Sequence, residues 1–84
     1  MAVHNKYKYN PENFRHMLNI ADDLSEFYRL LEIYRENEND DNWFYLRECW
    51  ETLFFSIKHR EVEGYLNPVK AQEMRNYLEE LIND

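Results

Sequence analysis

Two pairs of histidine and glutamate residues have the spacing that comes nearest to chemistry in this sequence. Glu12 stands four residues before His16, and His59 stands four residues before Glu63, so each pair would share one face of a helix. Each pair offers two ligands to a metal ion, whereas a zinc or di-iron site needs more ligands converging from several segments. We therefore expect ordinary surface pairs, with no metal and no cofactor.

The hydroxyl and thiol groups do not form a nucleophilic site either. A serine nucleophile of the hydrolase type stands on a tight turn flanked by glycines, and a phosphate-binding loop also needs several glycines. The sequence contains a single glycine, Gly64. None of the candidate nucleophiles lies in such a setting: Ser25, Cys49, Thr52 and Ser56. We expect no enzymatic activity.

The charge of the chain excludes two classes of partner. It carries 17 acidic and 10 basic residues, for a net charge of −7. Two of the bases, Lys6 and Lys8, precede the first acidic residue, so the rest of the chain is more acidic still. Such a body repels nucleic-acid phosphates and anionic membranes. We expect no direct binding to nucleic acid or membrane.

An acidic inhibitor stays open as an alternative function. Small acidic proteins can present carboxylates at phosphate-like spacing and so block a nucleic-acid-binding protein. Six acidic residues are grouped near the middle of the chain: Glu36, Glu38, Asp40, Asp41, Glu48 and Glu51. Arg35 and Arg47 interrupt this group, and the net charge lies within the range that solubility alone requires.

The single cysteine and the hydropathy pattern predict a cytoplasmic location. Cys49 is the only cysteine, so the chain has no internal disulfide, as is typical of a reducing compartment. The amino terminus has no apolar run of the signal-peptide kind. No stretch approaches the roughly 20 apolar residues of a membrane span.

Composition and the positions of helix-capping and helix-ending residues predict an all-α protein. One glycine, two prolines and an abundance of Leu, Glu and Arg favour helices. Asn10–Pro11 and Asn67–Pro68 each place a capping side chain before a proline at the first helical position. The polar segment 37–42 is typical of a loop that ends in a helix cap, and Gly64 is typical of a helix end.

These signals predict a three-helix antiparallel bundle with helices at 11–36, 41–62 and 68–82. Short loops force neighbouring helices to run antiparallel. We expect one domain over residues 10–84, preceded by a disordered arm at 1–9. A break at Asp22–Ser25 is an alternative for the first helix, but the apolar periodicity continues through that segment.

The middle helix is predicted to be apolar on two opposite faces. The wider arc points toward the core and contains Trp43, Leu46, Cys49, Trp50, Leu53, Phe54 and Ile57. Phe44, Phe55 and Val62 lie roughly 160° away around the helix. Because the third helix is short, we expect the half of the bundle near the 37–42 loop to stay uncovered. The predicted protein interface comprises Leu30, Ile33, Phe44, Tyr45, Phe55 and Val62.

The resulting expectation is a small cytosolic protein-binding module, an adaptor or regulator that self-associates. A two-fold homodimer is the commonest closed assembly for such a domain. Two coverings from within the chain remain as alternatives. The arm could fold back over the face with Tyr7 and Tyr9, or the first helix could break and wrap around it.

Overall fold

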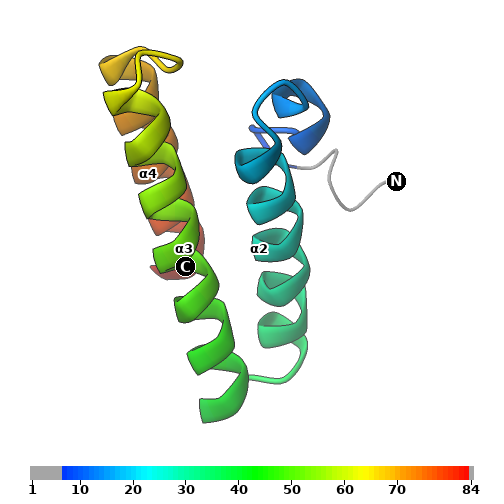
Figure 1. Cartoon of the computed structure of the whole chain (residues 1–84). Coiled ribbons are helices and arrows are strands. Elements are labelled where there is room, and N and C mark those ends of the chain that lie inside the picture. The colour runs from blue at the N-terminus through cyan, green and yellow to red at the C-terminus, as the bar shows by residue number, and fades with distance from the viewer. Residues whose placement is uncertain (1–6, 84) are drawn as a thin grey trace.

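The computed structural model describes residues 7–83, apart from the side chain of Leu18. Within this range the chain forms a short 3₁₀ helix, η1 (Pro11–Phe14), and three α-helices, α2 (Leu18–Glu36), α3 (Asp40–Val62) and α4 (Pro68–Asn83). Helices α2 and α3 form an antiparallel hairpin, and α4 returns along α3 (Figure 1). The prediction of an all-α three-helix bundle is confirmed.

Asparagine caps and one glycine set the helix boundaries. The Oδ1 atoms of Asn10, Asn39 and Asn67 each accept a hydrogen bond from a backbone amide two or three residues later, at 2.8–2.9 Å. Each bond satisfies an amide that has no partner inside its helix. Gly64 follows α3 with a φ of 88°, a backbone conformation in which a side chain would be strained. The caps at Asn10 and Asn67 and the glycine end were predicted.

The first predicted helix is broken, which corrects the prediction of a continuous helix over 11–36. The break lies at residues 15–17, before the alternative position at Asp22–Ser25. Pro11, Phe14 and Met17 are all buried. Because Arg15 and His16 have ordinary helix propensities, we attribute the break to the burial of η1 against the rest of the protein.

The segment Tyr7–Tyr9 packs against α2 and α4. Tyr7 and Tyr9 are both buried, and the Tyr9 ring lies edge-on to the ring of Tyr77, with centroids 5.4 Å apart. The backbone amide of Lys8 donates a hydrogen bond to the Tyr77 hydroxyl at 2.9 Å. Residues 7–9, which we predicted to belong to a disordered arm, are therefore packed against the helices. Residues 1–6 of the predicted arm lie outside the described residues.

The core is drawn from the facing sides of all three α-helices. Its fully buried large side chains are Ile20, Leu24, Phe27, Tyr28, Leu31, Leu46, Leu53, Ile57, Met74 and Leu78. Trp50 and Phe54, which we predicted in the same core, are half-buried. They lie at its edge, where the guanidinium of Arg75 is 5.5 Å from the centroid of the Phe54 ring.

Helix α4 reaches further toward the α2–α3 turn than we predicted from its length. Leu81 and Ile82 pack against the core near the carboxyl end of α4. Arg35, at the end of α2, donates a hydrogen bond to the backbone oxygen of Leu81 at 3.3 Å. The end of the bundle near the α2–α3 turn therefore has α4 as its third layer. The prediction that this end lacks a third layer is wrong.

Candidate interaction surface

Helix α3 exposes a line of large apolar side chains on the side opposite the core. Phe44, Phe55 and Val62 have 57%, 68% and 76% of their surface exposed. At 100° per residue they lie within about 20° of one another around the helix. We call this side of the helix the outer face of α3.

The outer face is exposed because the neighbouring helices pack against the flanks of α3. On the α2 side, Ser56 donates a hydrogen bond to an Asp23 carboxylate oxygen at 2.6 Å. On the other side, Arg75 of α4 bonds to Glu61 at 3.0 Å. Ser56 and Glu61 are about 140° apart around the helix. The inner arc between them faces the core, and no element of residues 7–83 covers the opposite side, where Phe44, Phe55 and Val62 are exposed.

The exposed apolar side chains are separated along the helix by charged ones. Phe44 and Phe55 are eleven residues apart, or about 16 Å along the axis. Glu48 and Glu51 lie between them on the same face, and both are exposed. The outer face is therefore an alternating line of apolar and charged groups, and not the continuous hydrophobic patch that the sequence suggested.

The other predicted interface residues lie beside the outer face or away from it. Tyr45 is 57% exposed, and its ring lies 5.7 Å from that of Phe44, so the two form an aromatic pair at the start of α3. Leu30 is half-buried and packs against the core. Ile33 is 37% exposed on α2. The four most exposed of the six predicted interface residues therefore lie on α3.

Neither of the two coverings considered from the sequence occurs in residues 7–83. Tyr7 and Tyr9 point into the core beside α2 and α4. The first helix does break, but the broken-off η1 leaves Phe44 and Phe55 exposed. The described part of the chain does not cover this face itself.

A row of aromatic rings supports Phe55 from beneath. The row runs outward from the buried Phe27 to Trp50, with ring centroids 6.3 Å apart. It continues to Phe54 and then to Phe55, each step being an edge-on contact at 5.7 Å. Such geometry is favourable between aromatic rings. Ring contacts therefore connect Phe55, although it is 68% exposed, to the edge of the core.

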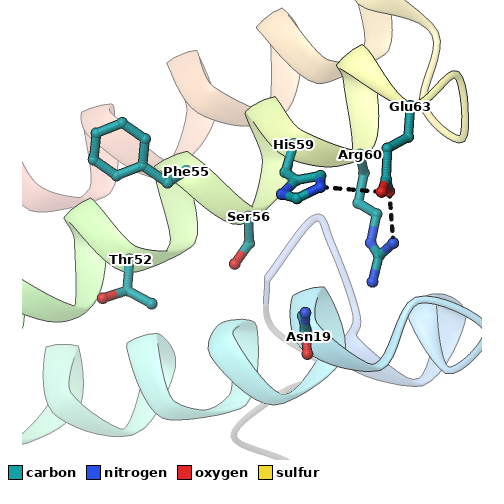
Figure 2. A pocket seen from close by; sticks show the side chains of 7 residues that line it. All are labelled: Asn19, Thr52, Phe55, Ser56, His59, Arg60 and Glu63. Atoms are coloured by element: carbon teal, nitrogen blue, oxygen red, sulfur yellow. Dashed lines mark hydrogen bonds and ion pairs between the residues drawn. The ribbon is translucent and has the colours of Figure 1, made fainter.

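A shallow groove of about 530 Å³ runs beside Phe55. Figure 2 shows it between α3 and the start of α2, with Asn19 on the opposite side from the α3 residues. Its lining residues are Asn19, Thr52, Phe55, Ser56, His59, Arg60 and Glu63. This mixed lining extends the outer face toward α2.

The polar groups of the groove bond to one another and to α2. His59 Nε2 lies 3.0 Å from Glu63 Oε2, and Arg60 donates to the other oxygen of this carboxylate at 2.8 Å. The hydroxyl of Ser56 donates a hydrogen bond to an Asp23 carboxylate oxygen of α2 at 2.6 Å. These contacts are typical of structural hydrogen bonds and of the surface pair predicted for His59 and Glu63.

The second histidine–glutamate pair is not formed. Glu12 forms an ion pair with Arg15 at 3.0 Å, and the chain leaves the helical conformation before His16. Across residues 7–83, no group of three or more His, Cys, Asp or Glu side chains is placed to hold a metal ion. None of the helices in this range combines the length and apolar character needed to cross a membrane.

Cys49 is half-buried on the flank of α3 that faces α2. Its Sγ lies 3.9 Å from the backbone oxygen of Asp23. Burial, together with the nearby carboxylates of Glu26 and Asp23, raises the pKa of the Cys49 thiol to about 12. A thiol in this state is a poor nucleophile and a poor metal ligand at neutral pH.

The sequence analysis did not predict two exposed apolar residues and one partly buried ion pair. Tyr65 and Val69 are each 67% exposed, in the turn after α3 and at the start of α4. Val69 lies about 200° around α4 from Ala71, which is on the buried side. The helical period could therefore have predicted that Val69 is exposed. The pair of Arg75 with Glu61 gave no signal, because the two residues come from different helices.

No protein-family model, curated protein or solved structure matches this chain.

Proposed function

We propose that this chain is a small protein-binding module, an adaptor or regulator, that self-associates through the outer face of α3. A binding role in the cytoplasm, without catalysis, is part of the proposal. The observation that carries it is the alignment of Phe44, Phe55 and Val62 on one face that no described part of the chain covers. Apolar anchors aligned on one face of a helix are a common means by which a helix docks on a protein partner.

The energetics favour a dimer of modest affinity. Complete burial of a phenylalanine or valine side chain contributes roughly 1.5–3 kcal/mol. Two chains together would bury six such side chains, against an association cost of about 4–15 kcal/mol. With mid-range values the two terms leave roughly 4 kcal/mol in favour of association, which corresponds to a dissociation constant of about 1 mM.

The acidic-inhibitor alternative differs in how its binding depends on salt. Its acidic residues around the α2–α3 turn are exposed, but Arg47 lies 3.6 Å from Glu51 and partly offsets that carboxylate. Binding by surface carboxylates is screened at high ionic strength. Binding through Phe44 and Phe55 persists in high salt, because its main contribution is apolar burial.

Sedimentation equilibrium of the full chain tests the proposal. As the concentration rises from the micromolar to the millimolar range, in low and in high salt, the average mass of the wild-type protein should rise from that of one chain toward twice that mass. Phe55→Glu should shift the protein to a folded monomer, because it places a charge in the proposed interface. Val69→Glu is the matched control, since Val69 has nearly the same exposure but lies on α4.

Two results would contradict self-association through this face. One is a wild-type chain that stays monomeric at every concentration. The other is a dimer that Phe55→Glu leaves intact, which would move the contact to another surface. Circular dichroism of each variant confirms that the helices are retained.

A further inference from the structure

The outer face of α3 has the spacing of a helix-pairing seam. Its positions advance by alternate steps of four and three residues: Phe44, Glu48, Glu51, Phe55, Lys58 and Val62. The positions along which two helices pair in a coiled coil have the same spacing, and three of the six positions here are apolar. The seam is exposed from Phe44 to Val62, and its charged members differ in sign between the two halves of the helix.

An antiparallel two-fold pairing matches these residues to one another. With the axis level with Leu53, positions equally far before and after that residue face each other across the interface. Phe44 then faces the partner's Val62, and Glu48 faces the partner's Lys58. The Phe44 ring of each copy is thus covered by an apolar side chain of the other copy. The Glu48 carboxylate of each copy meets a lysine of the other copy.

Alternative pairings give poorer matches. A parallel pair places Glu48 against the partner's Glu48 and Lys58 against the partner's Lys58, and like charges repel. Sliding the antiparallel pair by one heptad in one direction sets Glu48 against the partner's Glu51. Sliding it in the other direction leaves Phe44 beyond the end of the partner's α3.

The charges of the seam also favour a second copy as the occupant. Between Phe44 and Val62, Arg47 and Lys58 balance Glu48 and Glu51 on this side of α3, although the whole chain carries −7. Within residues 7–83, neither Glu48 nor Lys58 has an ion-pair partner. Glu51 would face the partner's Phe55, where its methylene groups can cover the ring while the carboxylate stays in water.

We propose that two copies of this chain pair antiparallel through α3, with the axis level with Leu53 and with Glu48 opposite the partner's Lys58. This inference rests on the proposed function, because it specifies the partner and the register at the same face. Apolar burial supplies the affinity, and the two symmetric charge pairs select the register and the direction.

Charge exchange on the full chain tests this register. Glu48→Lys places two like-charged pairs in the dimer, and so does Lys58→Glu, so each single variant should weaken association roughly tenfold or more. The double variant restores both pairs with the signs reversed and should associate about as well as the wild type. A mixture of the two single variants should form a heterodimer, since one chain is basic at both positions and the other is acidic at both. Sedimentation equilibrium measures all four cases.

Net charge alone predicts a different pattern. Glu48→Lys changes the net charge from −7 to −5 and Lys58→Glu changes it to −9, so a general repulsion effect would strengthen the first and weaken only the second. Glu73→Lys, on the exposed side of α4, is the matched control and should not weaken association.

The outcomes separate the register from the proposed function. If the wild type dimerises and Phe55→Glu abolishes the dimer, but the double variant is no better than the singles, this pairing is wrong and the interface stands. A wild type that is monomeric up to millimolar concentration overturns both. If the face binds only a different protein, the register and self-association are wrong, whereas the protein-binding role stands.

Discussion

The ring of Tyr7 lies flat on the ring of Tyr28, with centroids 4.1 Å apart and an angle of 5° between the planes. Tyr28 has none of its surface exposed, and its hydroxyl donates a hydrogen bond to the backbone oxygen of Tyr9 at 2.7 Å. The Tyr7 hydroxyl bonds to the carboxylate of Glu32. Burial raises the pKa of both tyrosines. The segment before η1 is therefore part of the core.

Replacing Tyr28 with phenylalanine should destabilise the protein by about 1–3 kcal/mol. The substitution keeps the ring stacking but leaves the buried carbonyl of Tyr9 without its hydrogen bond. Urea unfolding measures the difference. Tyr45→Phe is the control, because Tyr45 is exposed and should change stability little. Equal stability of Tyr28→Phe and the wild type would mean that the segment does not pack as described.

Leu53→Ala should reduce the free energy of unfolding by about 2–5 kcal/mol. Leu53 is fully buried at the centre of α3, so truncation removes apolar contacts and leaves a cavity. Val69→Ala, at an exposed position, should stay within about 0.5 kcal/mol of the wild type. Thermal melts that coincide for Leu53→Ala and the parent would show that this side of α3 is not the core.

Removal of the α4 cap should cost about 1 kcal/mol. The Asn67 side chain accepts hydrogen bonds from the amides of Val69 and Lys70 at 2.8 and 3.4 Å, and Asn67→Ala leaves both amides without this acceptor. Hydrogen exchange should be faster in the first turn of α4, while Asn67→Asp should keep its protection. Unchanged exchange in the alanine variant would move the helix start elsewhere.

The Cys49 thiol should react slowly in the folded protein at neutral pH. Its pKa rises from 9.0 to about 12 on folding, which lowers the thiolate fraction by roughly a thousandfold. Iodoacetamide should therefore modify the native chain at least about a hundredfold more slowly than the urea-unfolded chain. Equal rates in the two states would contradict the burial of this thiol.

The same shift predicts the sign of the pH dependence of stability. Because the folded state holds the thiol proton more tightly than the unfolded state, the contribution of Cys49 is complete below about pH 9 and declines as the pH rises toward about 12. Cys49→Ser removes this contribution. Over that range, its stability should fall less steeply than that of the wild type, as measured by urea titrations at several pH values.

The sequence by itself determined the features that depend on neighbouring residues. The caps at Asn10 and Asn67 and the end of α3 at Gly64 could be predicted, because each rests on a hydrogen bond or a backbone angle within a few residues. The exposure of Phe44, Phe55 and Val62 likewise follows from the helical period once Leu46, Leu53 and Ile57 face the core.

Only the tertiary structure decided which surfaces meet. The break at residues 15–17 and the burial of Tyr7 against Tyr28 depend on contacts between segments about twenty residues apart, for which the local sequence carries no signal. The pairing of Arg75 with Glu61 and the reach of α4 to Arg35 have the same origin. Helix periodicity determines which side of each helix is apolar, but the packing of all elements together determines what covers that side, because burial is a property of the assembled bundle.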